Sequence, residues 1–147
     1  MILYADTSWW VAFKNSRDHH HQAAVSVWDI FQEIAVIWTP WHRVEVFNAI
    51  RQAERMGFLT TSGLVIRALE NEVRLGYWPH VEFEWTDAVR TANELSAVHS
   101  RDHTIRAMDL FHVAIACEVG SERFLTFDED QASLAEAAGL VVWKGKR

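Results

Sequence analysis

The sequence predicts an α/β protein in which a parallel sheet of four to five strands lies between two layers of helices. Short apolar segments with strand character alternate with helical segments along the chain, as helical crossovers between parallel strands require. Continuous apolar strands are typical of a sheet that is covered on both faces. Carboxylates directly follow two of these strands, and ligands bind at the carboxyl ends of strands in such sheets. We therefore expect a three-layer α/β/α fold with a site at that edge.

Length and cysteine content are those of one cytoplasmic domain. The 147 residues fit a single domain, assigned to residues 1–147, with a core that needs no disulfide bond. Cys117 is the only cysteine, and its apolar helical surroundings favour a packing role over a nucleophilic one. No apolar run reaches the about 20 residues of a membrane span, and the first strand lacks the basic lead of a signal peptide. We expect no association with a membrane.

Net charge excludes one class of nucleic-acid-binding protein. The formal charge is −6 and the isoelectric point about 5.7, which disfavours a protein that coats nucleic acid through a broad basic face. A nuclease is still compatible with this charge, because a metal-dependent site concentrates acidic groups where the cation binds. Basic side chains that could neutralise a polyanionic substrate around such a site are Lys14, Arg17, Arg43, Arg51 and Arg55.

The first stretch, MILYADTSWW, contains a buried strand at residues 2–5 that ends in Asp6. A helix over residues 7–14 follows, and Thr7 or Ser8 satisfies free backbone groups at its start. Asp6 has two interpretations, a plain helix cap that accepts backbone N–H bonds or a member of an acidic site. The other acidic residues of the chain have to decide between them.

A helical stripe of apolar residues predicts a second helix over residues 20–34. Three consecutive histidines, His19, His20 and His21, stand at its start. Adjacent helical residues point about 100° apart, so these three side chains cannot all face one metal ion. We interpret the run as a solvated helix start.

A strand over residues 35–39 leads into a helix that Pro40 begins and that extends to Gly57. Glu45 and Asn48 are three residues apart and share a face of this helix, in the turns above the carboxyl edge of the sheet. Glu45 is therefore either half of a surface salt bridge or an acid that points into the site.

The middle of the chain is less informative. Residues 60–75 form another amphipathic helix. Residues 81–85 alternate apolar and acidic side chains, which indicates an edge strand or an extended loop. Thr86 or Asp87 caps the next helix, and residues 100–103 form the turn that follows it.

The segment TIRAMDLFHVAIACEVG predicts a helix that is apolar over most of its surface and therefore largely buried. Asp109 lies in the middle of it, with Arg106 three residues before and His112 three residues after. Burial of an unpaired carboxylate is costly unless the charge is neutralised or coordinated. Asp109 is thus either the ion-pair partner of Arg106 or part of an acidic site.

Residues 123–127 predict a strand that ends in Asp128, which repeats the arrangement at Asp6. The two acidic residues that come next can stabilise the N-terminus of a helix over residues 131–138 through its dipole. A last strand at residues 140–143 completes the alternation of strands and helices.

Four acidic residues converge in this scheme. Asp6 and Asp128 follow strands, and Glu45 and Asp109 belong to helices packed at the same edge. Carboxylates that lie so close repel one another unless a divalent cation neutralises them. Oxygen ligands favour Mg²⁺ or Mn²⁺ over zinc, and Mg²⁺ keeps several waters while it bridges to phosphate oxygens. This composition is suited to phosphodiester hydrolysis.

The ordered set of motifs resembles the PIN-domain ribonucleases and, within them, the VapC-like toxins of bacterial toxin–antitoxin pairs. The resemblance covers nearly the whole chain and rests on LYADTSWW, RVEVFNAI, RAMDLFHVAIA and FLTFDEDQASLAEAAGL, in that order. It implies a PIN-like fold and a Mg²⁺-dependent endoribonuclease in which Mn²⁺ can substitute. Carried over by residue, it implies metal-binding acids at Asp6, Glu45, Asp109 and Asp128, support from Thr7, Ser8 and Asn48, and a further ligand at Asp130.

The resemblance also implies the partners of the chain. These are an RNA substrate, a cognate antitoxin whose tail enters the acidic site, and a second copy in a homodimer. The number of Trp and Phe residues, more than the core obviously requires, independently favours the homodimer. Trp9 and Trp10 depart from the family pattern, and they either pack in the core or at a dimer interface, or stack on a substrate base.

Two other functional classes are weighed against the nuclease. An aspartyl-phosphate phosphatase also places an Asp after its first strand, but it generally needs a second Asp two residues later, where this chain has Ser8. A noncatalytic binding module of the same fold would keep the core and lose acids, whereas all four acids are present. A metal-dependent RNA cleavage assay separates the three interpretations.

Overall fold

A four-stranded parallel sheet forms the centre of the computed structural model, which describes residues 1–145. The strands are β1 (Ile2–Ala5), β2 (Ala35–Val36), β3 (Arg123–Leu125) and β4 (Val142–Trp143), in the order β2-β1-β3-β4. β1 pairs with β2 on one side and with β3 on the other, and every pairing is parallel. The predicted α/β fold with four to five parallel strands is therefore confirmed.

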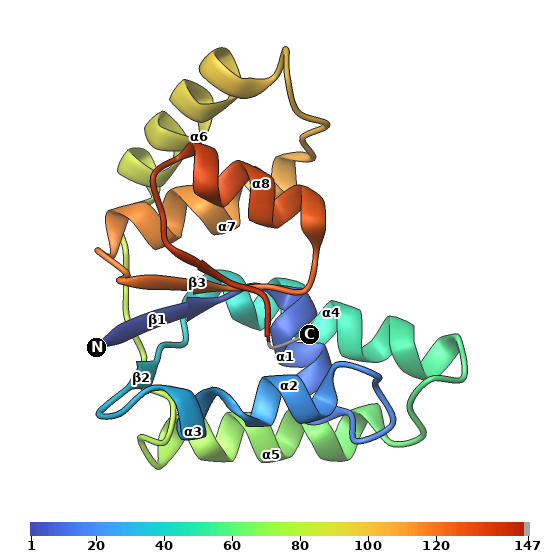
Figure 1. The fold of residues 1–147 in the computed structure, drawn as a ribbon. Coiled ribbons are helices and arrows are strands. Elements are labelled where there is room, and N and C mark those ends of the chain that lie inside the picture. The colour runs from blue at the N-terminus through green and yellow to red at the C-terminus, as the bar shows by residue number, and fades with distance from the viewer. Residues whose placement is uncertain (146–147) are drawn as a thin grey trace.

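Helices lie on both faces of this sheet. Figure 1 shows α6, α7 and α8 on one face and α1, α2, α3 and α5 on the other, while α4 contacts both α1 and α5. The described residues form helices α1 (Thr7–Lys14), α2 (His21–Val25), α3 (Val27–Ile30), α4 (Pro40–Arg55), α5 (Ser62–Arg74), α6 (Trp85–His99), α7 (Ala107–Glu118) and α8 (Glu129–Ala137). No helix among residues 1–145 is both long and apolar enough to cross a membrane.

The side chains of β1 alternate between two cores. Leu3 and Ala5 point to the layer that contains α1, whereas Tyr4 packs in the second core, against α7 and α8. Trp9 and Trp10 belong to the first core and are fully buried. The packing interpretation of these two residues is thus correct and base stacking is wrong, because neither ring can reach a ligand.

The predicted helix over residues 20–34 is two short helices, α2 and α3, that meet at Ser26. The Ser26 hydroxyl donates to the carbonyl of Ala23 at 2.8 Å, a local bond that competes with continuation of the helix. The chain is already extended at Phe31, where α3 ends. Periodicity located the apolar side chains but could not detect this interruption.

The histidine run is solvated only at its first member. The His19 side chain is 83% exposed. The His20 ring stacks on Phe127, with ring centroids 4.4 Å apart and planes within 2°. His21 Nδ1 lies 2.9 Å from the carbonyl oxygen of Ala12, so it packs against α1.

Residues 81–85 form an extended connection rather than an edge strand, which decides between the two predicted alternatives. Only His80 makes a bridge, parallel to Trp38, and Trp85 is already the first residue of α6. The backbone leaves the sheet edge after Val81, whose N–H donates to the carbonyl of Trp38 at 2.8 Å.

Helix α7 begins at Ala107, so Asp109 lies in its first turn and not in the middle, as the sequence had suggested. The backbone at Arg106 is extended, and its side chain forms no capping hydrogen bond. Met108 is exposed, and the buried part of the helix starts only at His112. A position in the first turn places Asp109 at the edge of the sheet, half-buried and open to solvent.

Candidate active site

A cleft with a volume of about 620 Å³ opens at the carboxyl edge of the sheet. It brings together all four predicted acids and three of the four supporting residues. They come from the ends of β1 and β3 and from helices α1, α4 and α7. Asp130 does not line it. The predicted site residues that do are Asp6, Thr7, Ser8, Glu45, Asn48, Asp109 and Asp128.

Asp6 and Asp128 follow two adjacent strands, Asp6 directly after β1 and Asp128 three residues after β3, because β3 ends at Leu125 and not at the predicted residue 127. Each is the N-cap of the helix that follows its strand, α1 for Asp6 and α8 for Asp128. Asp6 Oδ1 accepts from the N–H of Trp9 at 3.0 Å, and Asp128 Oδ1 accepts from the N–H of Gln131 at 2.9 Å. The cap interpretation of Asp6 is therefore confirmed, and the same carboxylate also lines the cleft, where its role as a site acid stays a prediction.

Two hydroxyl groups, those of Ser8 and Thr126, connect Asp6 by hydrogen bonds to the residues that follow β3. Ser8 Oγ donates to Asp6 Oδ1 at 2.6 Å and accepts from the N–H of Phe127 at 2.9 Å. Thr126 Oγ1 donates to Asp6 Oδ2 at 2.5 Å and accepts from the N–H of Asp128 at 2.9 Å. Both oxygens of Asp6 are thus fixed. This role of Ser8 also fills the position at which a phosphatase would carry its second acid.

Thr126 is a site residue that the sequence interpretation missed. It is completely buried, and its hydroxyl joins the backbone of Asp128 to the carboxylate of Asp6. The available signal was a hydroxyl residue at the end of an apolar strand, two positions before an acid. Such a residue mirrors Ser8, two positions after Asp6.

Burial is the first cause of the raised pKa values in the cleft. Burial raises the pKa of Asp6 to about 6, although the hydroxyls of Ser8 and Thr126 and the Trp9 N–H act in the opposite direction. Burial raises the pKa of Glu45, and the charge of Asp109 adds to the effect. The pKa of Asp109 is raised by burial and then by Asp128. Repulsion between the acids is real but secondary.

Simple ion pairs do not explain Glu45 and Asp109. Within residues 1–145 no Lys or Arg lies within 4.0 Å of Glu45, whose nearest ion-pair partner is His112 Nε2 at 3.9 Å. In the same part of the chain, no Arg106–Asp109 pair forms at that distance. Gln131 Nε2 instead donates to the backbone carbonyl of Asp109 at 3.3 Å and joins the starts of α7 and α8. The salt-bridge alternative for Glu45 and the Arg106 pair for Asp109 are therefore the two interpretations that the structure does not support.

A buried histidine, His112, lies directly behind the acids. Its Nδ1 is 2.9 Å from the Tyr4 hydroxyl, and its Nε2 is 3.0 Å from Thr7 Oγ1. Burial holds the pKa of His112 well below its ordinary value, so the ring is neutral at neutral pH. The ring thus connects Thr7 to Tyr4 in the core. The sequence signal that could have identified His112 was its position one turn after Asp109 on an apolar helix.

A second buried histidine, His42, supports the end of β1. The N–H of Thr39 donates to His42 Nδ1 at 2.9 Å, which places the proton on Nε2. Nε2 then donates to the carbonyl of Ala5 at 2.7 Å, immediately before Asp6. Burial lowers the pKa of His42 to about 4, which keeps this donor neutral and in one tautomer.

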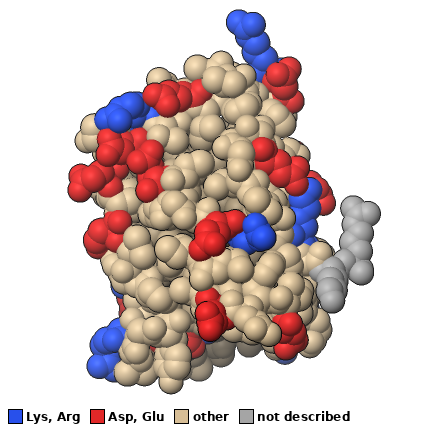
Figure 2. Space-filling model, turned by 60° about the vertical axis from the view of Figure 1, so that its left-hand side comes forward, with Lys and Arg blue, Asp and Glu red and all other residues tan. Residues whose placement is uncertain are grey.

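The basic residues suggested for the rim do not line the cleft. Lys14 binds Glu72 at 2.6 Å, and Arg43 pairs with Glu70, so both cations are neutralised elsewhere. Arg51 and Arg55 are exposed on α4, and only Arg17 borders a hollow beside the cleft. On the face drawn in Figure 2, Lys and Arg are scattered among acidic side chains, with no broad basic patch in that view.

The donor set of the cleft consists mainly of carboxylate, hydroxyl and amide oxygen atoms, and two histidines, His20 and His112, also line it. Within residues 1–145 no three His, Cys, Asp or Glu side chains converge closely enough to enclose a bare metal ion. Hydrated Mg²⁺ needs no such cage, because it keeps several waters and uses one or two carboxylates. The cleft therefore fits a hydrated, oxygen-seeking cation better than a structural zinc ion.

Comparison with known structures identifies several similar folds. The Mycobacterium tuberculosis VapC20, a toxin that cleaves the sarcin-ricin loop, is 19% identical with a TM-score of 0.69, over 99% of each chain. A chain of VapBC2 from Rickettsia felis, bound to a DNA fragment from their promoter, is 12% identical with a TM-score of 0.71, over 99% of this chain and 100% of that one. FitAcB from Neisseria gonorrhoeae is 15% identical with a TM-score of 0.62, over 97% and 96%.

The sequence comparisons give the family. No curated protein matched the chain significantly. The model of the PIN domain matches residues 3–137, a range that contains all four acids of the cleft. With this match over most of its length, and with the fold of the VapC toxins, the chain belongs to the PIN-domain family.

Proposed function

We propose that the protein is an endoribonuclease that hydrolyses RNA phosphodiester bonds with Mg²⁺, or with Mn²⁺ in its place. One observation carries this proposal: carboxylates from β1, α4, α7 and the end of β3 line a single cleft, although they are far apart in the sequence. Such a density of partly buried acids is unfavourable for an empty binding pocket and favourable for a cation that binds phosphate.

The four acids differ in how firmly hydrogen bonds hold their carboxylates. Asp6 is fixed by Ser8, Thr126 and the Trp9 N–H, so it offers a rigid reference point at the bottom of the cleft. The carboxylates of Glu45 and Asp109 accept no hydrogen bond from other described residues and are available to hold water or a cation. When bound, Mg²⁺ neutralises phosphate charge and lowers the pKa of a bound water. The rigid and the free carboxylates together orient that hydrated ion.

The test of the nuclease proposal is cleavage of RNA by the purified protein. We expect cleavage with Mg²⁺ or Mn²⁺ and none in EDTA. Asp6→Ala, Glu45→Gln, Asp109→Asn and Asp128→Asn should each lower the rate at least about 100-fold, since electrostatic groups of this kind contribute that much. The matched control is Asp29→Asn, which neutralises an exposed acid in the first turn of α3, outside the cleft. Activity that survives EDTA, or two near-normal site variants, contradicts the proposal.

We further propose that the chain is the toxin of a toxin–antitoxin pair. Support comes from its fold, which is similar to those of the VapC20 toxin and of chains in the VapBC2 and FitAcB structures. The acidic cleft is suited to receive a basic tail of a cognate antitoxin. Expression should arrest growth, and co-expression of a neighbouring small gene product should relieve the arrest. A host that is indifferent to the intact protein contradicts the toxin role and leaves the nuclease proposal standing.

A homodimer is the proposed assembly. Large apolar side chains stay exposed on α4, α5 and α6, where Val44, Leu64 and Val89 are each more than half exposed. A stable interface needs about 800 Å² from each partner and is enriched in such side chains. Light scattering at micromolar concentration should give the mass of two chains, and a monomer there contradicts the proposal.

A further inference from the structure

Phe58 is an exposed aromatic residue that lines the same cleft as the acids. Phe58 lines the same hollow as Asp6 and Asp109, yet its side chain is 60% exposed. The lining also contains the apolar residues Val11 and Met56 and a further acid, Asp18. The cleft therefore combines acidic and apolar side chains with an uncovered phenyl ring.

The backbone holds this ring in place. Helix α4 closes with Gly57 at φ +81, and the N–H groups of Gly57 and Phe58 donate to the carbonyls of Glu54 at 3.0 Å and Ala53 at 2.9 Å. This is the double hydrogen bond of a glycine-terminated helix. Asn15, a buried residue, donates its Nδ2 to the Phe58 carbonyl at 3.1 Å. Both backbone groups of Phe58 are fixed, so its ring is displayed from a rigid support.

A second hollow shares Asp18 and Phe58 with the cleft. It is lined by Phe58 and by the turn that follows α1, including Arg17 and His19. Arg17 is exposed and forms no ion pair within residues 1–145, in contrast to Lys14 and Arg43. An exposed cation thus lines a hollow next to the cleft, together with Asp18 and Phe58, and is placed to contact a phosphate that neighbours a base on the ring.

We propose that Phe58 is a platform that stacks on an unpaired nucleobase beside the scissile phosphate, while Arg17 contacts the neighbouring phosphate. This inference rests on the proposed ribonuclease function and concerns which side chains of this chain contact the unpaired base and its neighbouring phosphate. A base in a duplex has both faces covered by its neighbours, whereas an unpaired base can stack on an aromatic side chain. Any base can stack on an aromatic ring. Phe58 therefore selects single-stranded RNA over duplex RNA and does not select a base sequence.

The experiment measures binding and cleavage separately. Fluorescence anisotropy follows a labelled single-stranded RNA and the same sequence as a hairpin, with Mg²⁺, on an Asp109→Asn background that prevents cleavage. Phe58→Ala should weaken single-strand binding about 5- to 150-fold and leave hairpin-stem binding unchanged, which is the range for loss of one stacked base. Phe58→Trp should retain binding and Phe58→Leu should not. In the active protein, Phe58→Ala should raise KM and leave kcat within about twofold.

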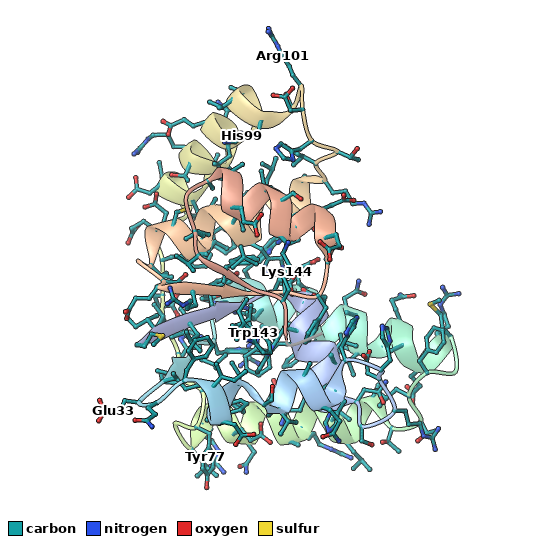
Figure 3. All side chains as sticks on the ribbon, in the orientation of Figure 1. Glu33, Tyr77, His99, Arg101, Trp143 and Lys144 are labelled. Atoms are coloured by element: carbon teal, nitrogen blue, oxygen red, sulfur yellow. The ribbon has the colours of Figure 1, made fainter. Side chains whose placement is uncertain are left out.

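The matched control is Tyr77→Ala. Tyr77 is 69% exposed, does not line the cleft, and projects outward beyond α5 (Figure 3). Unchanged single-strand binding in Phe58→Ala overturns the platform, and so does full binding by Phe58→Leu. If Phe58→Ala weakens binding of a partner protein only, the ring belongs to a protein interface and the platform is wrong.

The outcomes also separate this inference from the nuclease proposal. A wild type that binds single-stranded RNA through Phe58 but never cleaves it overturns the nuclease and supports the platform. A wild type that cleaves, with an unchanged KM in Phe58→Ala, overturns the platform alone. A wild type that does not bind RNA overturns both.

Discussion

Thr126 donates its hydroxyl hydrogen to Oδ2 of Asp6 across 2.5 Å, although 120 positions separate the two residues in the chain. The same hydroxyl accepts from the N–H of Asp128. One buried side chain therefore sets the relative positions of two of the four acids. This contact exists because β1 and β3 are adjacent in the sheet, with Ala5 beside Leu125.

Thr126→Val removes this hydroxyl at nearly constant volume. Asp6 Oδ2 and the N–H of Asp128 then lose their partner in a buried position, so we expect unfolding to become easier by about 1–3 kcal/mol. Cleavage should fall as well, because both acids lose their support. Thr126→Ser keeps the hydroxyl and should restore both properties in urea melts and cleavage assays.

The control for this variant is Thr91→Val, which removes an exposed hydroxyl that donates to Glu118 at 2.6 Å on the other side of the protein. We expect Thr91→Val to change the unfolding free energy by no more than about 0.5 kcal/mol. A loss of the same size in both variants would mean that Thr126 contributes only an ordinary hydrogen bond.

Asp6→Asn tests the raised pKa of Asp6. Folding raises this pKa from 3.8 to about 6, so the native state holds an extra proton between these values and wild-type stability is lost as pH rises through them. The variant has no such loss. In metal-free protein, its unfolding free energy relative to wild type should increase by roughly 2.4 kcal/mol between pH 4 and pH 7.5. A difference that is the same at both pH values would show that the cleft does not perturb Asp6.

His42→Gln should show the opposite pH dependence. The pKa of His42 is lowered from 6.5 to about 4 in the folded state, so its stabilising contribution is complete above pH 6.5 and is lost as pH falls toward 4. The unfolding free energy of wild type should exceed that of the variant most at pH 7.5. This difference should be smaller by roughly 3 kcal/mol at pH 4. His19→Gln, which removes an exposed ring, is the control in chemical denaturation at both pH values.

Asp109→Asn separates a shared cation site from a local ion pair. The variant loses a carboxylate with a raised pKa, so in EDTA at neutral pH it should melt at the same temperature as wild type or higher. Added Mg²⁺ should stabilise wild type by about 2.7 kcal/mol at 100 times Kd, and the variant by less. Asp29→Asn should respond to Mg²⁺ as wild type does. A variant that melts lower and ignores Mg²⁺ would defeat the shared-site model.

The sequence by itself determined the layered fold and the four acids that share the cleft. Strand periodicity and the acids at the ends of strands are local properties, and parallel strands bring their carboxyl ends to one edge. Asp6 and Asp128 could therefore be placed together from the sequence, as could Glu45 above them. The exact start of α7 could not, because Arg106 provides no capping side chain to mark it.

Tertiary structure alone decided what supports these acids. Thr126, His42 and His112 act through partners that are far away in the sequence, and the local signals at Thr126 and His112 do not identify those partners. The same holds for Phe58, whose exposure depends on how α4 ends and on its bond with Asn15. A hydrogen bond between distant segments is specified by strand order and packing, so its partners become identifiable only when the chain has folded.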